Sequence, residues 1–150
     1  MRVFNDVDEL VGAVGDHLGY GPWLEITQDR IDRFADATDD WQWIHVDPDR
    51  AADGPFGATI AHGYLTESLI PKLAEDIFRV DNVRMGINYG SNKVRFPHPV
   101  RAGSRVRAGA TLVAAQHTPN GVQAVITIIV EIEDASKPAC IAETVRLLVP

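Results

Sequence analysis

The chain has 150 residues, of which 45% are hydrophobic and 23% are charged, and its net charge is −7. This length suits a single domain with one hydrophobic core. The acidic balance argues against nucleic acid as the main partner, because phosphate binding needs a basic face. The N-terminus has no basic region followed by an apolar stretch, and no apolar run is long enough to cross a bilayer. We therefore expect a cytoplasmic protein without membrane insertion.

The first half of the chain predicts helices and loops. Apolar residues three and four apart predict an amphipathic helix over residues 6–18. Thr27 is a suitable N-cap for a second helix that ends near residue 36. Asp47, followed by Pro48, predicts a third, short helix that ends at residue 52.

The longest predicted helix covers residues 60–78. Its apolar residues lie most of the way around it, so we expect it to be buried. Pro71 should kink this helix or divide it into two segments.

From residue 83 onward the pattern indicates strands. We expect strands over residues 84–96, 104–117, 122–133 and 139–149, with a hairpin turn at Pro119, Asn120 and Gly121. Consecutive long strands joined by turns should be antiparallel neighbours. An antiparallel sheet with one buried helix across its face gives an α+β domain.

The only cysteine, Cys140, excludes an internal disulfide and fits a reducing compartment. It lies in a strand-like run, which predicts a buried, inert thiol rather than a nucleophile.

A basic segment between residues 84 and 107 contains no acidic residue and six basic ones: Arg84, Lys93, Arg95, Arg101, Arg105 and Arg107. Two interpretations stay open. The residues either form the solvated edges of a strand pair or bind an anionic ligand, such as the phosphates of a nucleotide-bearing carrier.

The segment from Asp40 to Pro48 brings a carboxylate and the imidazole of His45 among large apolar side chains. Carboxylates and imidazoles suit proton transfer near neutral pH. The two side chains can converge on one water if the chain leaves its helix at Thr38 and Asp39, and Trp41 and Trp43 could then exclude bulk water. Alternatively, Asp40 only caps or turns the chain while His45 fills a core position.

A second segment, Gly57 to Leu65, predicts a glycine-marked loop that leads into the long helix. The unpaired backbone N–H groups at a helix start can hold a developing negative oxygen. The two segments together indicate acid–base chemistry beside a carbonyl group.

Residues 37–48 read Ala-Thr-Asp-Asp-x-x-x-Ile-His-x-Asp-Pro, and residues 54–65 read Gly-Pro-Phe-Gly-x-x-Ile-Ala-His-Gly-Tyr-Leu. Both patterns resemble the hydratase-2 motif of the MaoC-like (R)-specific enoyl-CoA hydratases. Residues 88–97 also look like the corresponding strand of actinobacterial members. The resemblance covers nearly the whole chain from about Trp23.

This resemblance implies a hot-dog fold, in which an antiparallel sheet wraps around a long central helix, and a homodimer whose sheets pair edge to edge. It implies a reversible syn addition of water to a trans-2-enoyl-CoA that gives an (R)-3-hydroxyacyl-CoA. The partner would be an acyl thioester of coenzyme A or of acyl carrier protein, and no cofactor would be required.

The same resemblance identifies Asp40 and His45 as the catalytic acid–base pair, and Gly63 as the backbone donor to the thioester oxygen. His62, Gln42 and Asn88 complete the predicted oxyanion and substrate-binding set. We expect Asp40 to act mainly as the base for water and His45 to donate the proton to C2.

The chain departs from the family pattern in two places. The family commonly has Gly where this chain has Asp39, and Asn-Pro where it has Gln42 and Trp43. The amide of Gln42 could still orient the catalytic pair, whereas Trp43 removes a rigid turn. These departures affect the predicted loop path and the substrate shape.

The same residues allow three alternatives to a hydratase. The spacing of Asp40, His45, Asp47 and His62 fits no standard metal site, so we expect none. A hot-dog acyl-CoA thioesterase could direct the same water at the thioester carbonyl. A non-catalytic partner subunit of a dehydratase would contribute only binding surface.

Overall fold

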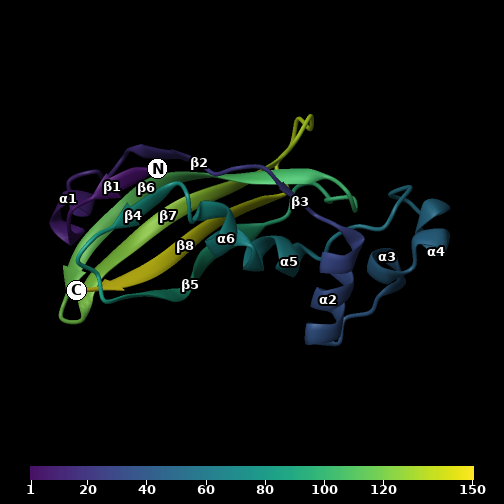
Figure 1. Ribbon diagram of the computed structural model, residues 1–150, viewed down its shortest axis with the longest axis horizontal. Helices are drawn as coiled ribbons and strands as arrows, with labels where there is room; N and C mark the ends of the chain where they lie inside the picture. The colour runs from purple at the N-terminus through teal and green to yellow at the C-terminus, as the bar shows by residue number, and fades with distance from the viewer.

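The second half of the chain forms a long antiparallel sheet in the computed structural model, which describes residues 1–150 (Figure 1). The strand order is β2-β6-β7-β8-β5, and the short strand β3 also pairs with β6. The strands are β2 (His17–Tyr20), β3 (Leu24–Glu25), β5 (Met85–Arg95), β6 (Arg105–Thr118), β7 (Gly121–Ile132) and β8 (Cys140–Val149). The predicted α+β class is confirmed.

Strands β6, β7 and β8 are consecutive antiparallel neighbours, as predicted. The β6–β7 hairpin closes where Thr118 pairs with Gly121. Gly121 has a φ of 136°, and a Cβ there would lie 2.1 Å from the carbonyl oxygen of Leu148, so only glycine fits. In β7 every second residue from Val122 to Ile132 is buried, which is the period of a half-buried strand.

Strand β5 pairs with β8 and forms one edge of the sheet. A simple turn after β5 would instead have placed it beside β6, the next strand in the chain. The reason lies in the connection that follows it. The backbone of Val100 and Ala102 bonds to Ala61 and Thr59, so this segment crosses beside the helical region instead of making a hairpin. One edge of β5 is consequently left without a strand partner.

The N-terminal helix is shorter than expected. Helix α1 covers Val7–Val11, and residues 17–20 form β2 instead of continuing the helix. Gly12 is the C-cap, and Gly15 adopts a φ of 98°, which a continuing helix does not allow. The chain also forms a small parallel pair from β1 (Arg2–Phe4) and β4 (Phe78–Val80).

Three helices lie beyond one end of the sheet: α2 (Gln28–Thr38), α3 (Trp43–Val46) and α4 (Pro48–Ala52) (Figure 1). Both predicted N-caps are confirmed. The side chain of Thr27 accepts a hydrogen bond from the N–H of Arg30, and that of Asp47 accepts one from the N–H of Arg50.

The predicted long helix is divided into α5 (Gly63–Ser68) and α6 (Ile70–Ala74). Pro71 lies in the first turn of α6 and explains the division, because it has no N–H to continue the helix. The predicted end at residue 78 was wrong, since Phe78 begins β4.

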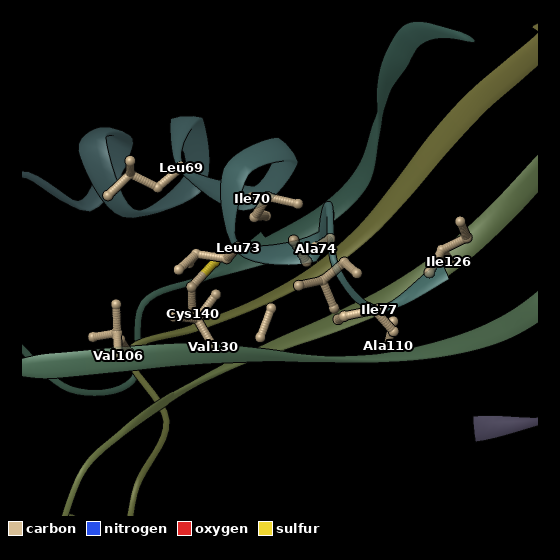
Figure 2. Packing of buried hydrophobic residues seen from close by; sticks show 14 of the residues in the cluster. Leu69, Ile70, Leu73, Ala74, Ile77, Val106, Ala110, Ile126, Val130 and Cys140 are labelled. Carbon is tan, nitrogen blue, oxygen red and sulfur yellow. The ribbon is translucent and has the colours of Figure 1, made fainter. Parts of the chain in front are cut away.

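Both helices cover the inner face of the sheet. Figure 2 shows side chains from this helical segment above side chains from the strands: Leu69, Ile70, Leu73, Ala74 and Ile77 above Val106, Ala110, Ile126, Val130 and Cys140. Burial of each large aliphatic side chain contributes roughly 1.5–3 kcal/mol. This packing fixes the position at which α5 begins.

Cys140 is fully buried, and burial raises the pKa of its thiol to about 12, as expected of an inert thiol. In the basic segment, Arg105 and Arg107 form ion pairs with Glu133 and Glu131, which favours the strand-edge interpretation for these two. No helix combines the length and hydrophobicity needed to span a membrane. The cytoplasmic location stays a prediction.

Candidate active site

The chain leaves α2 where the sequence predicted. Helix α2 ends at Thr38, and Asp39 adopts the left-handed conformation with a φ of 58°. This conformation favours glycine, which is the residue that the resembling family commonly carries there. The reversal brings Asp40 back towards α3 and towards the loop that precedes α5.

His45 lies in α3 and is buried, with 6% of its surface exposed. Its Nδ1 lies 2.6 Å from the carbonyl oxygen of Ile60. Because a carbonyl only accepts, Nδ1 carries the proton, and Nε2 of the neutral ring presents a lone pair. Burial lowers the pKa of His45, so the neutral form is favoured near neutral pH.

His62 is stacked against His45, with ring centroids 3.8 Å apart and an interplanar angle of 25°. Its Nε2 lies 2.9 Å from the backbone oxygen of Asp40, which makes Nε2 the donor. Phe34 packs on His62 at 5.0 Å, and Nδ1 of His62 is buried without a partner. A bare lone pair there is less costly than a buried N–H, which agrees with Nε2 as the donor of this ring.

The carboxylate of Asp40 faces this histidine pair from a half-exposed position. One of its oxygens and one ring nitrogen from each of His45 and His62 all lie within 4.8 Å of one another. No direct hydrogen bond joins the Asp40 carboxylate to either ring, and its Oδ2 lies 3.9 Å from Nε2 of His62. Groups at such separations can share one bridging water, which joins atoms up to about 5.5 Å apart.

A cavity of about 300 Å³ opens beside His45 and reaches the start of α5. It is lined mainly by apolar residues, including Phe56, Phe96 and Val100, together with Gly63. A Cβ on Gly63 would lie 2.8 Å from the Phe96 ring. Glycine therefore allows the backbone to approach that ring closely. As the first residue of α5, Gly63 also has an N–H with no partner inside the helix.

The structure brings Asp40, His45, His62 and Gly63 together but does not do so for Asn88. Asn88 lies on β5 and lines a separate cavity beside α6. Gln42 is the N-cap of α3, and its backbone oxygen accepts from the N–H of His45, while its exposed side chain makes no capping bond. Its predicted role as an orienting amide has no contact to support it.

The expectation that two tryptophans shield the pair was wrong. Trp41 is 53% exposed, and its indole N–H bonds to Asp36. Trp43 packs instead under the guanidinium of Arg50, 4.3 Å from the ring centroid. Asp40 consequently keeps contact with solvent.

Sequence reasoning missed Gln28, in the first turn of α2. Its amide N–H donates to the backbone oxygen of His45 at 2.7 Å, and its side-chain oxygen accepts from the hydroxyl of Thr59. Gln28 thereby ties α2 to the segment of His45 and to the loop of Thr59 that leads to α5. Neither contact has a local signal, because the partners lie 17 and 31 residues away.

Three potential metal ligands gather here, but their orientations do not converge. The rings of His45 and His62 are nearly parallel, so their lone pairs lie in separate planes, and Nε2 of His62 is bonded to Asp40. Asp47 caps α4 and is not part of the cluster. The donor set does not fit the tetrahedral or octahedral sites of common metals.

The family described as MaoC like domain matches residues 9–133. The chain belongs to this family. Within it, the chain is an enzyme of the hydratase and dehydratase class. It is 53% identical over 146 residues to a Mycobacterium tuberculosis protein named 3-hydroxyacyl-thioester dehydratase Z, with 97% of each chain covered.

Solved structures agree on the hot-dog fold. The (R)-hydratase from A. caviae superposes with a TM-score of 0.74 at 24% identity, covering 91% of this chain and 96% of that one. A subunit of the HadBC complex of Mycobacterium tuberculosis, described as a 3R-hydroxyacyl-ACP dehydratase, gives a TM-score of 0.63 at 17% identity, with coverages of 90% and 97%.

Proposed function

We propose that this MaoC-like protein catalyses the reversible hydration of a trans-2-enoyl-CoA to an (R)-3-hydroxyacyl-CoA. The observation that carries the proposal is the Asp40 carboxylate within 4.8 Å of a neutral His45, beside a cavity that reaches Gly63. The Mycobacterium tuberculosis relative, named a 3-hydroxyacyl-thioester dehydratase, supports the same reaction class.

The hydrogen bonds support His45 as the group that takes the proton from water. Its Nδ1–H is committed to the carbonyl of Ile60, which leaves Nε2 as a lone pair that accepts a proton. This favours the reverse of the assignment expected from sequence, in which Asp40 was the main base. Asp40 then orients the water and stabilises the imidazolium that forms.

In the hydration direction, water attacks C3 of the enoyl thioester while His45 takes one of its protons. A C3–O bond forms, the C2–C3 π electrons move towards the thioester oxygen, and an enolate-like charge develops. The imidazolium then returns a proton to C2, so water adds across the double bond. Delivery of both parts of water from one side of the site accounts for syn addition.

The backbone N–H of Gly63 is the proposed donor to the thioester oxygen as its negative charge grows. Helix α5 has only six residues, so its dipole adds little to this hydrogen bond. The close contact with Phe96 holds the peptide of Gly63 in place. The site needs no further chemical group for these steps.

The reaction is tested with purified protein and a short trans-2-enoyl-CoA. The enoyl-thioester absorbance should fall without release of free thiol, and chiral analysis should give the (R)-3-hydroxyacyl product. Release of free thiol would indicate the rival thioesterase activity. An (S) product would contradict the proposed stereochemistry.

We also propose a homodimer joined through β5. This strand of 11 residues is exposed along nearly its whole length and has an unpaired edge. It presents large apolar side chains, including Met85, Ile87 and Tyr89, and uncovered edges of this kind promote pairing between chains.

Light scattering should give twice the 16.4 kDa mass of the chain. Tyr89→Asp should shift the mass towards the monomer, whereas Tyr20→Asp, on the other edge of the sheet, should not. A stable monomer of the unmodified chain would contradict the homodimer.

A further inference from the structure

A second cavity, of about 490 Å³, lies between α5, α6 and the strands β5 and β8. Most of its lining residues are polar, and they include Asn88, Ser91, Thr144 and Arg146. The inner face of a hot-dog sheet is otherwise apolar here, as the packing in Figure 2 shows. A polar cavity at this place needs an explanation.

Arg146 is the unusual member of this lining. It lies on β8, next to the edge strand, and is paired with Asn88 of β5 on one side and with Ala124 of β7 on the other. Its guanidinium lies over the ring of Phe78, 5.9 Å from the centroid, and the residue is only partly exposed. Burial lowers the pKa of Arg146, although an arginine still stays charged near neutral pH.

The charge on Arg146 has no partner within the chain. Its Nε is buried and makes no hydrogen bond, and no carboxylate oxygen lies within 4.0 Å of the guanidinium. The acidic residue in the same wall, Glu67, instead accepts from the hydroxyl of Ser91 at 3.1 Å. Burying an unpaired charge is costly, and proteins accept that cost where a ligand supplies the opposite charge.

We propose that this cavity binds a carboxylate at the far end of the substrate's acyl chain, and that Arg146 holds it. This inference rests on the proposed function and specifies its substrate class: thioesters of unsaturated dicarboxylic acids. The planar fork of arginine matches a carboxylate with two parallel hydrogen bonds. The side-chain amide of Asn88 lies in the same wall and can add a further donor, whereas the hydroxyl of Thr144 already donates to the backbone oxygen of Ile126.

Both cavities lie along the same helical segment. Gly63 and Thr66 line the first cavity, and Glu67, Ile70 and Pro71 line the second, all on the α5–α6 segment. Seven or eight helical residues rise about 10–12 Å. An acyl chain of moderate length that starts at Gly63 would therefore bring its end to Arg146.

The test compares matched pairs of trans-2-enoyl-CoAs of equal length, one ending in a methyl group and the other in a carboxylate. At the favoured length, the unmodified protein should show a kcat/KM about tenfold or more higher for the carboxylate substrate. Arg146→Met should lower this ratio about 10- to 100-fold, as expected for loss of a charge-assisted contact. Arg79→Met, an exposed arginine of β4, should leave the ratio unchanged.

Arg146→Lys keeps the charge but loses the planar fork, so its ratio of kcat/KM values should fall between those of the unmodified protein and Arg146→Met. This variant replaces Arg146→Met in the test if Arg146→Met does not fold. Hydration of the methyl substrates without any preference for carboxylates would overturn this inference and leave the proposed function intact. A measured mass of Arg146→Met below that of the dimer, with an unchanged ratio of kcat/KM values, would also overturn this inference, because the charge would then serve a contact between subunits. Hydration of neither substrate would overturn the proposed function itself.

Discussion

The imidazole rings of His45 and His62 lie face to face, 3.8 Å apart, with Phe34 closing the outer side of His62. One ring donates to the carbonyl of Ile60 and the other to that of Asp40. These two hydrogen bonds fix the tautomers of the rings, and the stack links the two motifs of the sequence.

The rate of hydration should fall in acid only below the ordinary pKa of histidine, near 6.5. Burial lowers the pKa of His45, so the neutral form that takes the proton persists to lower pH. For the same reason His45 favours the folded state above its unfolded pKa, and this contribution is lost as pH falls through the lowered folded value. Profiles of kcat/KM and of Tm against pH test this, and an acid limb at or above pH 6.5 would contradict it.

Replacing His62 should change the pKa of its neighbour as well as the rate. His62→Gln removes the ring beside His45. The electrostatic effect of that ring lowers the pKa of His45, in addition to the larger effect of burial. We expect kcat/KM to fall about tenfold and its acid limb to move up towards pH 6.5. His117→Gln, a substitution of an exposed histidine far from the site, is the matched control. An unmoved acid limb would assign His62 a packing role only.

Gln28→Leu should destabilise the site by removing two partly buried hydrogen bonds. The backbone oxygen of His45 and the hydroxyl of Thr59 would both lose their partner, at a cost of about 1–3 kcal/mol. The comparison variant is Asp32→Ala, which removes only the solvent-exposed partner of Gln28. Denaturant unfolding measures the difference, and equal stabilities of the two variants would count against a role for Gln28.

Gly63→Ala should lower kcat/KM by about 100-fold, because its Cβ would displace Phe96 or the peptide of Gly63. Adding Phe96→Leu should restore part of the rate, since the smaller side chain leaves room for the methyl group. Steady-state kinetics on the single and double variants distinguish steric displacement from loss of the backbone donor. A single variant with the normal rate would remove Gly63 from the mechanism.

Local chemistry explains which parts of the fold were predictable. Thr27 and Asp47 cap their helices as predicted because a cap depends on residues only three positions apart. Pro71 divides the central helix for an equally local reason. The pairing of β5 with β8 could not be read in this way, because it depends on backbone bonds between residues 59–61 and 100–102.

In the candidate site, too, features with a local signal were predictable and those that depend on long-range contacts were not. The motifs placed Asp40, His45 and Gly63 in one region, since each lies near a turn or helix start with a recognisable signal. The environment of these residues was less predictable. Trp41 and Trp43 turned outward to bond Asp36 and to stack under Arg50, while Gln28 reached His45 from another helix. Long-range partners of this kind leave no pattern in one sequence.

The central claim is that Asp40 and His45 act on one shared water, and their paired substitution tests it most directly. Asp40→Asn and His45→Gln should each lower the rate of enoyl-CoA hydration by about 10²–10⁴-fold. The double variant should be little slower than either single one, because the residues act as a unit. If either single variant kept a rate within a few-fold of the unmodified protein, the account would be contradicted.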